Sequence, residues 1–228
     1  MKKRKFEFDL IVLGTGAGGS AAATIAAKNG LKVAVVENDL FGGESPNYGE
    51  IPIKALSYTA KTLYQAKKGT KMGIRSGSLG YSFQSILRWK DLAVKRTGAH
   101  DNEEFYKSAG ISTFRGTARF ITPHEISINQ AHISSENFLI ATGSKFKIPD
   151  IPNLKNIKFL TPRTILDIQR LPKSIFIIGG SPEAVEIAQI LSTLGTKVYI
   201  SEVSARLLPK EDEEVGITIE NFMVEEMK

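Results

Sequence analysis

A glycine-rich turn between an apolar strand and an alanine-rich helix constrains this fold more than any other feature. In FDLIVLGTGAGGSAAATIAAKNG, the apolar run Leu10–Leu13 is followed by Gly14, Gly16 and Gly19 in the pattern G-x-G-x-x-G. A helix then runs until Gly30 stops it. The first glycine permits the tight turn, the second lets backbone approach a pyrophosphate, and the third allows close helix packing.

An acidic residue completes the pattern one strand later. The second apolar strand, Leu31–Val36, ends on Glu37, and Asn38 follows it. A carboxylate at this position is placed to accept hydrogen bonds from a ribose. Strand, turn, helix, strand and acid in this order predict a βαβ dinucleotide site, with Glu37 and Asn38 on its ribose side.

The same arrangement returns in SIFIIGGSPEAVEIAQILSTLGTKVYISEV, so the chain contains an internal repeat. Gly179 corresponds to Gly14 and Glu202 to Glu37, and glycine and acid are 23 positions apart in both copies. Ser181 and Ala184 replace the second and third glycines. Alanine is tolerated at the third position, whereas a serine Cβ obstructs a phosphate at the second. A working nucleotide site and a purely structural unit are both open here.

The amino-acid composition excludes several kinds of site and partner for this protein. The chain has 228 residues, 42% of them hydrophobic, and no cysteine, which excludes disulfides, thiolate metal sites and thiol catalysis. The net charge of +6 is dispersed, so we expect solvated faces and no nucleic-acid partner. No segment is apolar over a membrane-spanning length, and a cytoplasmic protein is expected. His100, His124 and His132 have no metal-ligand company, so no metal site is predicted.

The region between the two copies predicts helices, then strands, then a linker. Apolar periodicity predicts helices over 53–71 and 82–97, with Tyr58, Tyr64 and Trp89 in the core. Short alternating runs over 111–140 predict a β-meander with turns near Pro123 and Asn129. The proline-rich stretch 147–154 predicts a stiff linker. We therefore expect an α/β protein with one Rossmann-like domain over 1–150 and a second, incomplete one over 151–228.

With these parts assembled, the sequence resembles the FAD-dependent pyridine nucleotide-disulfide oxidoreductases, the family of dihydrolipoamide dehydrogenase, glutathione reductase and mercuric reductase. The resemblance covers essentially the whole chain. It rests on five ordered features: GTGAGG with Glu37, GGESPNYGEIPIK, GTARF, IATGS before the linker, and the second βαβ unit followed by LLPKEDEEV.

The resemblance implies an FAD site in the first domain and an NAD site in the second. The residues that would hold FAD are Gly14, Gly16, Gly19, Glu37, Asn38, Gly42, Gly43, Ser45, Lys54, Ala118, Ala141, Thr142, Gly143 and Ser144. Those that would hold NAD are Gly179, Gly180, Ser181, Pro182, Glu183 and Glu202. NADP is disfavoured because the Glu202 carboxylate would repel its 2′-phosphate, although Arg206 could offset this repulsion.

The resemblance also implies catalytic positions. Lys54 and Glu186 occupy positions that pair beside the flavin in these enzymes, where they would join the two domains. The two redox cysteines of the family correspond to Ser45 and Glu50, neither of which forms a disulfide. For Glu50, a neutral replacement and acid-base work beside the flavin both remain open.

We therefore expect an FAD-dependent NAD(P)H oxidoreductase with an acceptor other than a disulfide. The alternative is a catalytically degenerate or truncated nucleotide-binding homologue with a structural or regulatory role. Relatives continue beyond the equivalent of Lys228, so weak FAD retention and self-association through an exposed sheet edge are also expected.

Overall fold

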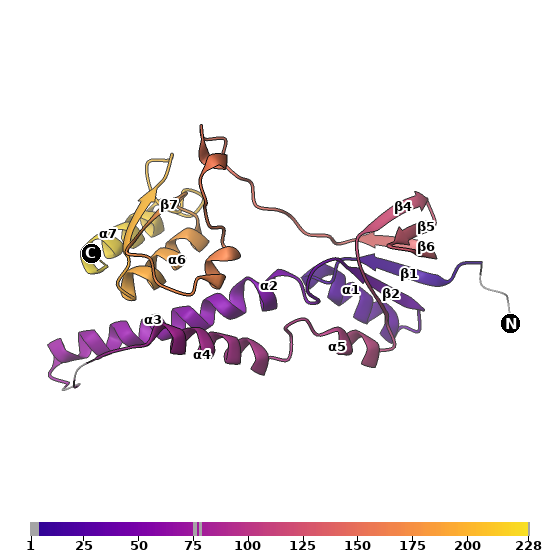
Figure 1. Cartoon of the computed structure of the whole chain (residues 1–228), viewed down its shortest axis with the longest axis horizontal. Coiled ribbons are helices and arrows are strands. Elements are labelled where there is room, and N and C mark those ends of the chain that lie inside the picture. The colour runs from indigo at the N-terminus through magenta and orange to yellow at the C-terminus, as the bar shows by residue number, and fades with distance from the viewer. Residues whose placement is uncertain (1–4, 75–76, 78, 228) are drawn as a thin grey trace. The chain divides into compact units, whose positions relative to one another are not determined.

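The computed structural model describes residues 5–74, 77 and 79–227, which form two compact units (Figure 1). The first unit comprises the described residues up to Glu50 together with Val94–Ile157, and the second comprises Ile51–Ala93 with the described residues from Lys158 onward. Each unit is thus built from two separate stretches of chain.

The first unit contains most of the β-structure. Its elements are β1 (Phe8–Leu13), α1 (Ala17–Lys28), β2 (Val33–Glu37), α2 (Glu44–Asn47), α5 (Glu103–Ser108), β3 (Ser112–Arg115), β4 (Ala118–Thr122), β5 (Glu125–Ile128), β6 (Ala131–Ile140) and the 3-10 turn η2 (Leu154–Asn156). The strands form one sheet in the order β3-β2-β1-β6-β5-β4. The expected meander over 111–140 holds for β4, β5 and β6, with turns at Pro123 and Asn129, whereas β3 pairs parallel to β2 instead.

Strand β6 belongs to both halves of this sheet. Its first residues pair antiparallel with β5, where Ile133 lies opposite Ile126. Its last residues pair parallel with β1, where Leu139 lies opposite Val12. One strand therefore joins the Rossmann-like parallel sheet to the antiparallel meander.

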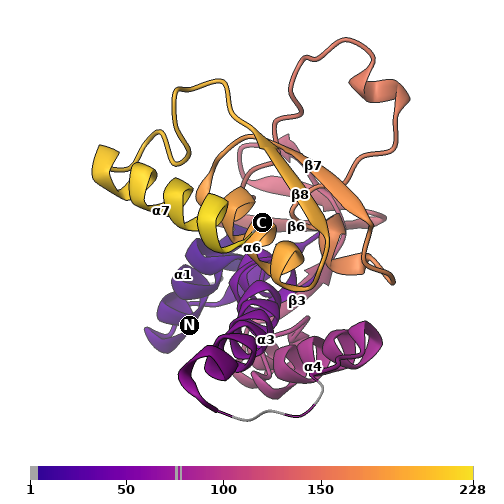
Figure 2. The same ribbon diagram turned by 90° about the vertical axis from the view of Figure 1, so that its left-hand side faces the viewer.

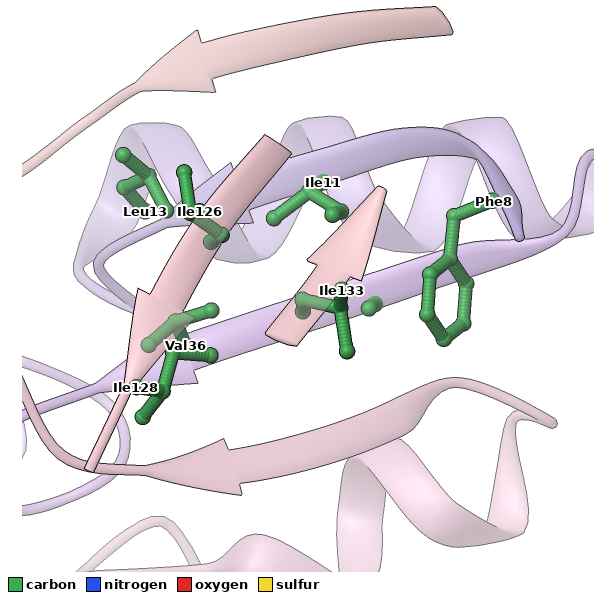
Figure 3. Close-up of a cluster of buried hydrophobic side chains, with 8 residues drawn as sticks. Phe8, Ile11, Leu13, Val36, Ile126, Ile128 and Ile133 are labelled. Atoms are coloured by element: carbon green, nitrogen blue, oxygen red, sulfur yellow. The ribbon is translucent and has the colours of Figure 1, made fainter. Parts of the chain in front are cut away.

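Two apolar cores cover the two faces of the parallel strands. Residues at alternate positions of β1 point to opposite faces, so Ile11 and Leu13 enter one core and Val12 the other. In the first core they meet Ile126 and Ile128 of the meander, and Figure 3 shows these side chains facing one another. The second core is closed by α1 and α5. Because both faces are covered, β2 is buried along its whole length.

The second unit is mainly helical. Its elements are α3 (Glu50–Gly69), which begins at the unit boundary, η1 (Thr70–Met72), α4 (Phe83–Arg96), most of which lies here, η3 (Thr164–Asp167), β7 (Ser174–Ile178), α6 (Pro182–Thr193), β8 (Lys197–Ser201) and α7 (Glu213–Glu226). Helices α3 and α4 run side by side (Figures 1 and 2). One buried cluster contains Leu56 of α3, Ile86 of α4 and Ile190 of α6.

The structure changes two expectations about the region 53–97. Both helices form close to the expected bounds, but α3 and α4 pack against α6 and lie mainly in the second unit, rather than with residues 1–150. The expected burial of Tyr58 and Trp89 is wrong, since these side chains are 68% and 41% exposed. Tyr58 lies two positions from both Leu56 and Ala60, which places it on the other side of the helix.

Among the residues that the structure describes, no helix is both long enough and apolar enough to span a membrane. Within the same residues, no group of three or more His, Asp or Glu side chains is arranged to hold a metal ion.

Candidate dinucleotide site

The turn after β1 requires glycine. Gly14 adopts φ +95°, in the left-handed region, and its N–H donates to the Val36 carbonyl at 2.8 Å. A Cβ at Gly14 would lie 2.4 Å from the Ala141 carbonyl oxygen. The first glycine of the fingerprint therefore serves both the turn and the close approach of the chain leaving β6.

The second and third glycines have different surroundings. A Cβ at Gly19 would lie 2.0 Å from the Gly14 carbonyl oxygen, so only glycine lets α1 pack this close to the turn. Gly16 is the N-cap of α1, and a Cβ there would meet nothing within 4 Å. The open space lies at a helix N-terminus whose backbone N–H groups favour an anion. This geometry fits the phosphate approach expected for Gly16.

Glu37 is buried and held by donors of its own chain. Glu37 is only 8% exposed to solvent. Oε2 accepts from the backbone N–H and the hydroxyl of Thr15 at 2.9 and 2.7 Å, and Oε1 accepts from the backbone N–H groups of Asn38 and Asp39 at 2.9 and 3.0 Å. Four hydrogen bonds fix the carboxylate beside the fingerprint turn. Its expected bond to a ribose stays a prediction.

The loop after β2 closes against the fingerprint. Gly42 and Gly43 adopt φ +99° and +71°, and a Cβ at Gly43 would lie 2.4 Å from the Cα of Gly16. The Asn47 side-chain amide donates to the carbonyls of Phe41 and Gly43 at 3.0 and 2.8 Å. The loop is thereby fixed in a shape that places its backbone on the second fingerprint glycine.

The second copy reproduces the turn and the acid. Gly179 adopts φ +102°, and its N–H donates to the Ser201 carbonyl at 2.7 Å. Glu202 accepts from the Gly180 and Ser204 backbone N–H groups at 2.7 and 2.8 Å. Hydrogen bonds from the backbone of Ser204 and then of Gly180 lower the pKa of the Glu202 carboxyl. The acid thus takes the same place as Glu37 in the first copy.

The serine of the second copy is occupied by its own helix. Ser181 caps α6, with its Oγ accepting from the Ala184 N–H at 3.3 Å and donating to Glu183 at 2.8 Å. Pro182 begins the helix, a position where its missing N–H costs nothing. The side chain of Ser181 therefore occupies the position at which the first copy leaves open space beside Gly16.

The structure brings Lys54 and Glu186 together within one unit. The Lys54 Nζ lies 2.7 Å from Glu186 Oε1, and the two side chains are 65% and 24% exposed. We expected this pair to join two domains, but both residues belong to the second unit because α3 packs against α6. The pair is an ion pair between neighbouring helices of that unit.

Comparisons with known proteins show which family the chain is similar to. Residues 8–226 match the family described as pyridine nucleotide-disulphide oxidoreductase. The chain is 33% identical over 216 residues to a dihydrolipoyl dehydrogenase of Acholeplasma laidlawii, covering 92% of this chain and 64% of that protein. It is 29% identical to a mercuric reductase of Staphylococcus aureus, covering 98% of this chain and 41% of that protein.

The chain belongs to the pyridine nucleotide-disulphide oxidoreductase family. Among solved structures, the HOCl-induced flavoprotein disulfide reductase RclA of Escherichia coli superposes with a TM-score of 0.80 at 26% identity, covering 96% of this chain and 47% of that one. The chain thus spans 64% of the length of that dihydrolipoyl dehydrogenase and 41% of the length of that mercuric reductase. The family uses FAD and NAD(P), and this member has no cysteine with which to form a redox disulfide.

The family resemblance places cysteines at two positions, which here are Ser45 and Glu50. These residues lie on two consecutive helices, α2 and α3. Ser45 is half-buried in α2, and Glu50 is exposed as the first residue of α3. Between them Gly49 donates its N–H to the Glu44 carbonyl at 2.7 Å. The loop keeps a defined backbone although a hydroxyl and a carboxylate replace the thiols.

The remaining residues expected at the FAD site lie around the ends of β1, β4 and β6. Ala118 is the first residue of β4, and Ala141 donates its N–H to the Leu13 carbonyl at 2.8 Å. Gly143 adopts φ +70° in the chain that continues from β6 through Thr142 and Ser144. Their contacts to a cofactor stay predictions.

Sequence reasoning missed the polar residues that support this site. Thr15 links Glu37 to the loop, since its hydroxyl also accepts from the Gly42 N–H at 3.1 Å. Asp101 accepts from the Phe41 N–H of the same loop, and Arg115 donates to the Asp39 carbonyl. Thr15 could have been noticed because it is the only hydroxyl inside the GTGAGG fingerprint. Nothing local in the sequence marks Asp101, which comes 60 residues after the segment that it contacts.

Proposed function

We propose that this chain binds FAD at the first βαβ unit and takes part in electron transfer from NAD(P)H to an acceptor other than a disulfide. The open space beside Gly16, at the N-terminus of α1, carries this proposal. A tight turn, a helix N-terminus and a carboxylate held by hydrogen bonds come together there. An anionic pyrophosphate with a ribose attached matches these three features.

In this proposal each group of the site has a distinct task. The α1 N-terminus and Gly16 would hold the pyrophosphate, and Glu37, oriented by its existing donors, would accept from a ribose hydroxyl. FAD, when bound, supplies two-electron chemistry with a reduced nicotinamide. Lys54 and Glu186 form an ion pair at 2.7 Å within the second unit, and the role beside the flavin that the family resemblance implies for them stays a prediction.

The acceptor is the point at which this chain departs from disulfide reductases. Two-electron exchange through an internal disulfide needs two thiols, and the chain has none. We therefore expect no NADH-dependent reduction of lipoamide, glutathione disulfide or mercuric ion above that of free flavin. Turnover of any of these three would contradict the proposal.

Glu50 offers two testable roles at this loop. Glu50 is exposed at the start of α3. It is either a replacement without a functional role or a proton donor to a reduced acceptor. Substituting Glu50→Gln removes the titration but keeps the shape. A loss of turnover with quinone or oxygen as acceptor, at unchanged FAD affinity, would assign the acid-base role.

A second candidate is a nucleotide-binding homologue without catalysis. Ser181 favours it, because this side chain stands at the position where the second copy would receive the NAD pyrophosphate. The two candidates differ in one measurement. Oxidoreduction requires an FAD absorbance spectrum that NADH bleaches under anaerobic conditions, whereas a spectrum that persists after NADH addition supports the non-catalytic homologue.

A chain that shows no flavin spectrum after incubation with FAD would overturn the FAD proposal itself. Titration of apoprotein with FAD, followed by quenching of flavin fluorescence, measures this directly.

A further inference from the structure

We propose that Asp101 is a positioning residue that holds the turn Phe41–Gly43 against Gly16 and so strengthens FAD binding. This inference rests on the proposed FAD site. Asp101 contacts no fingerprint residue itself. It acts through the loop that follows β2, which comes 60 residues earlier in the chain.

Asp101 is tied to the loop and to a cation at once. Its Oδ1 accepts from the Phe41 N–H at 2.9 Å and from Arg115 Nη2 at 2.7 Å. Its own backbone N–H donates to the Asn47 side-chain oxygen at 3.1 Å. Asp101 also adopts φ +42°, in the left-handed region that few residues other than glycine enter, although aspartate does so more often than most.

Asn47 carries the constraint to both ends of the turn. With its oxygen taken by Asp101, its amide nitrogen donates to the carbonyls of Phe41 and Gly43. The orientation of the amide is thereby fixed, because the oxygen must face an N–H and the nitrogen two carbonyls. The Asn47 bond comes from the Asp101 backbone N–H, so a substitution of the Asp101 side chain removes the acceptor of the Phe41 N–H and leaves the Asn47 bond in place.

Arg115 holds the carboxylate in place. Its guanidinium lies over the Phe41 ring, 4.6 Å from the centroid, and donates to the Asp39 carbonyl at 3.2 Å and to Glu103 at 3.4 Å. Burial raises the pKa of Asp101, but hydrogen bonds from Arg115 and the Phe41 N–H outweigh it and lower the pKa overall. An isolated surface pair has fewer restraints and contributes little.

The turn so held is the part of the loop closest to the fingerprint. A Cβ on Gly43 would lie 2.4 Å from the Gly16 Cα, which leaves no slack between the two backbones. Displacing Gly43 toward Gly16 would therefore close the space at the α1 N-terminus, and displacing it away would open the site to water. Either change lowers affinity for a pyrophosphate that must contact backbone N–H groups closely.

The test uses Asp101→Ala, Asp101→Asn and a matched control. Glu125→Gln changes an exposed side-chain contact of the same unit, between Glu125 Oε1 and His132 Nδ1 at 3.2 Å, on a strand that pairs with β4 and β6 rather than with the loop. FAD affinity is measured by fluorescence titration, and amide hydrogen exchange of Phe41–Gly43 is measured on the FAD-free proteins. We expect D101A to weaken FAD binding about tenfold and to speed exchange at these amides about tenfold, while E125Q changes neither.

D101N retains the size and one oxygen of the side chain, so it decides the question if D101A does not fold. We expect it to weaken FAD binding about threefold and to speed the same amides. Unchanged exchange at Phe41–Gly43 in the folded variants would overturn the positioning role, and faster exchange with unchanged FAD affinity would overturn its link to the cofactor. If the wild-type chain itself binds no FAD, the proposed function fails, and the exchange measurement alone then decides whether Asp101 holds the turn.

Discussion

The two βαβ units share a turn and an acid but differ in what surrounds them. In both, the first glycine has φ near 100° and donates to the second strand, and a glutamate at the end of that strand accepts backbone N–H groups of the turn. In the first unit, β2 is buried throughout. In the second, exposed and half-buried residues alternate along β7 and β8. Phe176 and Tyr199, on one face, are 64% and 47% exposed.

This difference separates what a motif encodes from what packing adds. The fingerprint specifies local backbone conformation, so it forms even in a two-stranded sheet covered by α6 on one face. Burial of the acid and close packing of the helix depend on further layers, which in the first unit are the meander and α5. The same motif therefore forms between two buried cores in one unit and beside an exposed sheet face in the other.

The largest expected contrast concerns the third position of the fingerprint. Gly19→Ala places a Cβ 2.0 Å from the Gly14 carbonyl oxygen and should lower the free energy of unfolding by about 2–3 kcal/mol. The second unit already carries Ala184 there, so the reverse change Ala184→Gly should cost only about 1 kcal/mol, through helix propensity. Urea unfolding of both variants measures this, and equal losses would contradict the difference in packing.

The acids should differ next. Glu37→Gln replaces one acceptor oxygen by an amide nitrogen facing two donors, and it should destabilise the protein by about 2 kcal/mol. Glu202→Gln should have a smaller effect, because Glu202 is only half-buried whereas Glu37 is buried. The same urea titration compares them. A larger effect at Glu202 would show that burial does not set the strength of these bonds.

Nucleotide choice probes the acid of the second unit directly. We expect NAD to bind about tenfold more tightly than NADP, because Glu202 repels a 2′-phosphate. Arg206 could have offset this, but its guanidinium donates to the carbonyls of Leu208 and Glu211 at 2.6 and 2.7 Å. Titration with both nucleotides tests the preference. Arg206→Ala should leave the ratio unchanged, and tighter NADPH binding that this variant abolishes would reverse the argument.

The smallest expected effect is a pH dependence confined to the first unit. Hydrogen bonds from Lys107 and then Thr113 lower the pKa of Glu103 on α5 to about 2. A lowered folded-state pKa stabilises the protein above the unfolded-state pKa, and this contribution is lost as the pH falls toward 2. We expect about 1 kcal/mol. In the Glu103→Gln variant, the free energy of unfolding should fall by about that amount less than in the wild type between pH 5 and pH 2. Glu104→Gln is the neighbouring control.

The fold was predictable where the pattern is local. The βαβ units, both long helices and the meander follow from glycine spacing, apolar periodicity and turn residues, and the Lys54–Glu186 contact follows from the family resemblance. The assignment of α3 and α4 to the second unit was not predictable, because it depends on which helix covers Leu56 and Ile86. The support of the loop by Asp101 and Arg115 was not predictable either, since a contact across 60 residues leaves no periodic signal.

The dual pairing of β6 also bears on how the protein is made. Strand β1 emerges from the ribosome before β6, its neighbour on one side, which lies 127 residues further along at Ser135, whose hydroxyl donates to the Phe8 carbonyl. At translation speeds of about 5–20 residues per second, that partner arrives roughly 6–25 s later. During this interval β1 has an open edge, and Gly14 lacks the Ala141 carbonyl against which it packs. The nascent fingerprint is therefore exposed to chaperones and to strand mispairing until the chain has returned from α3 and α4.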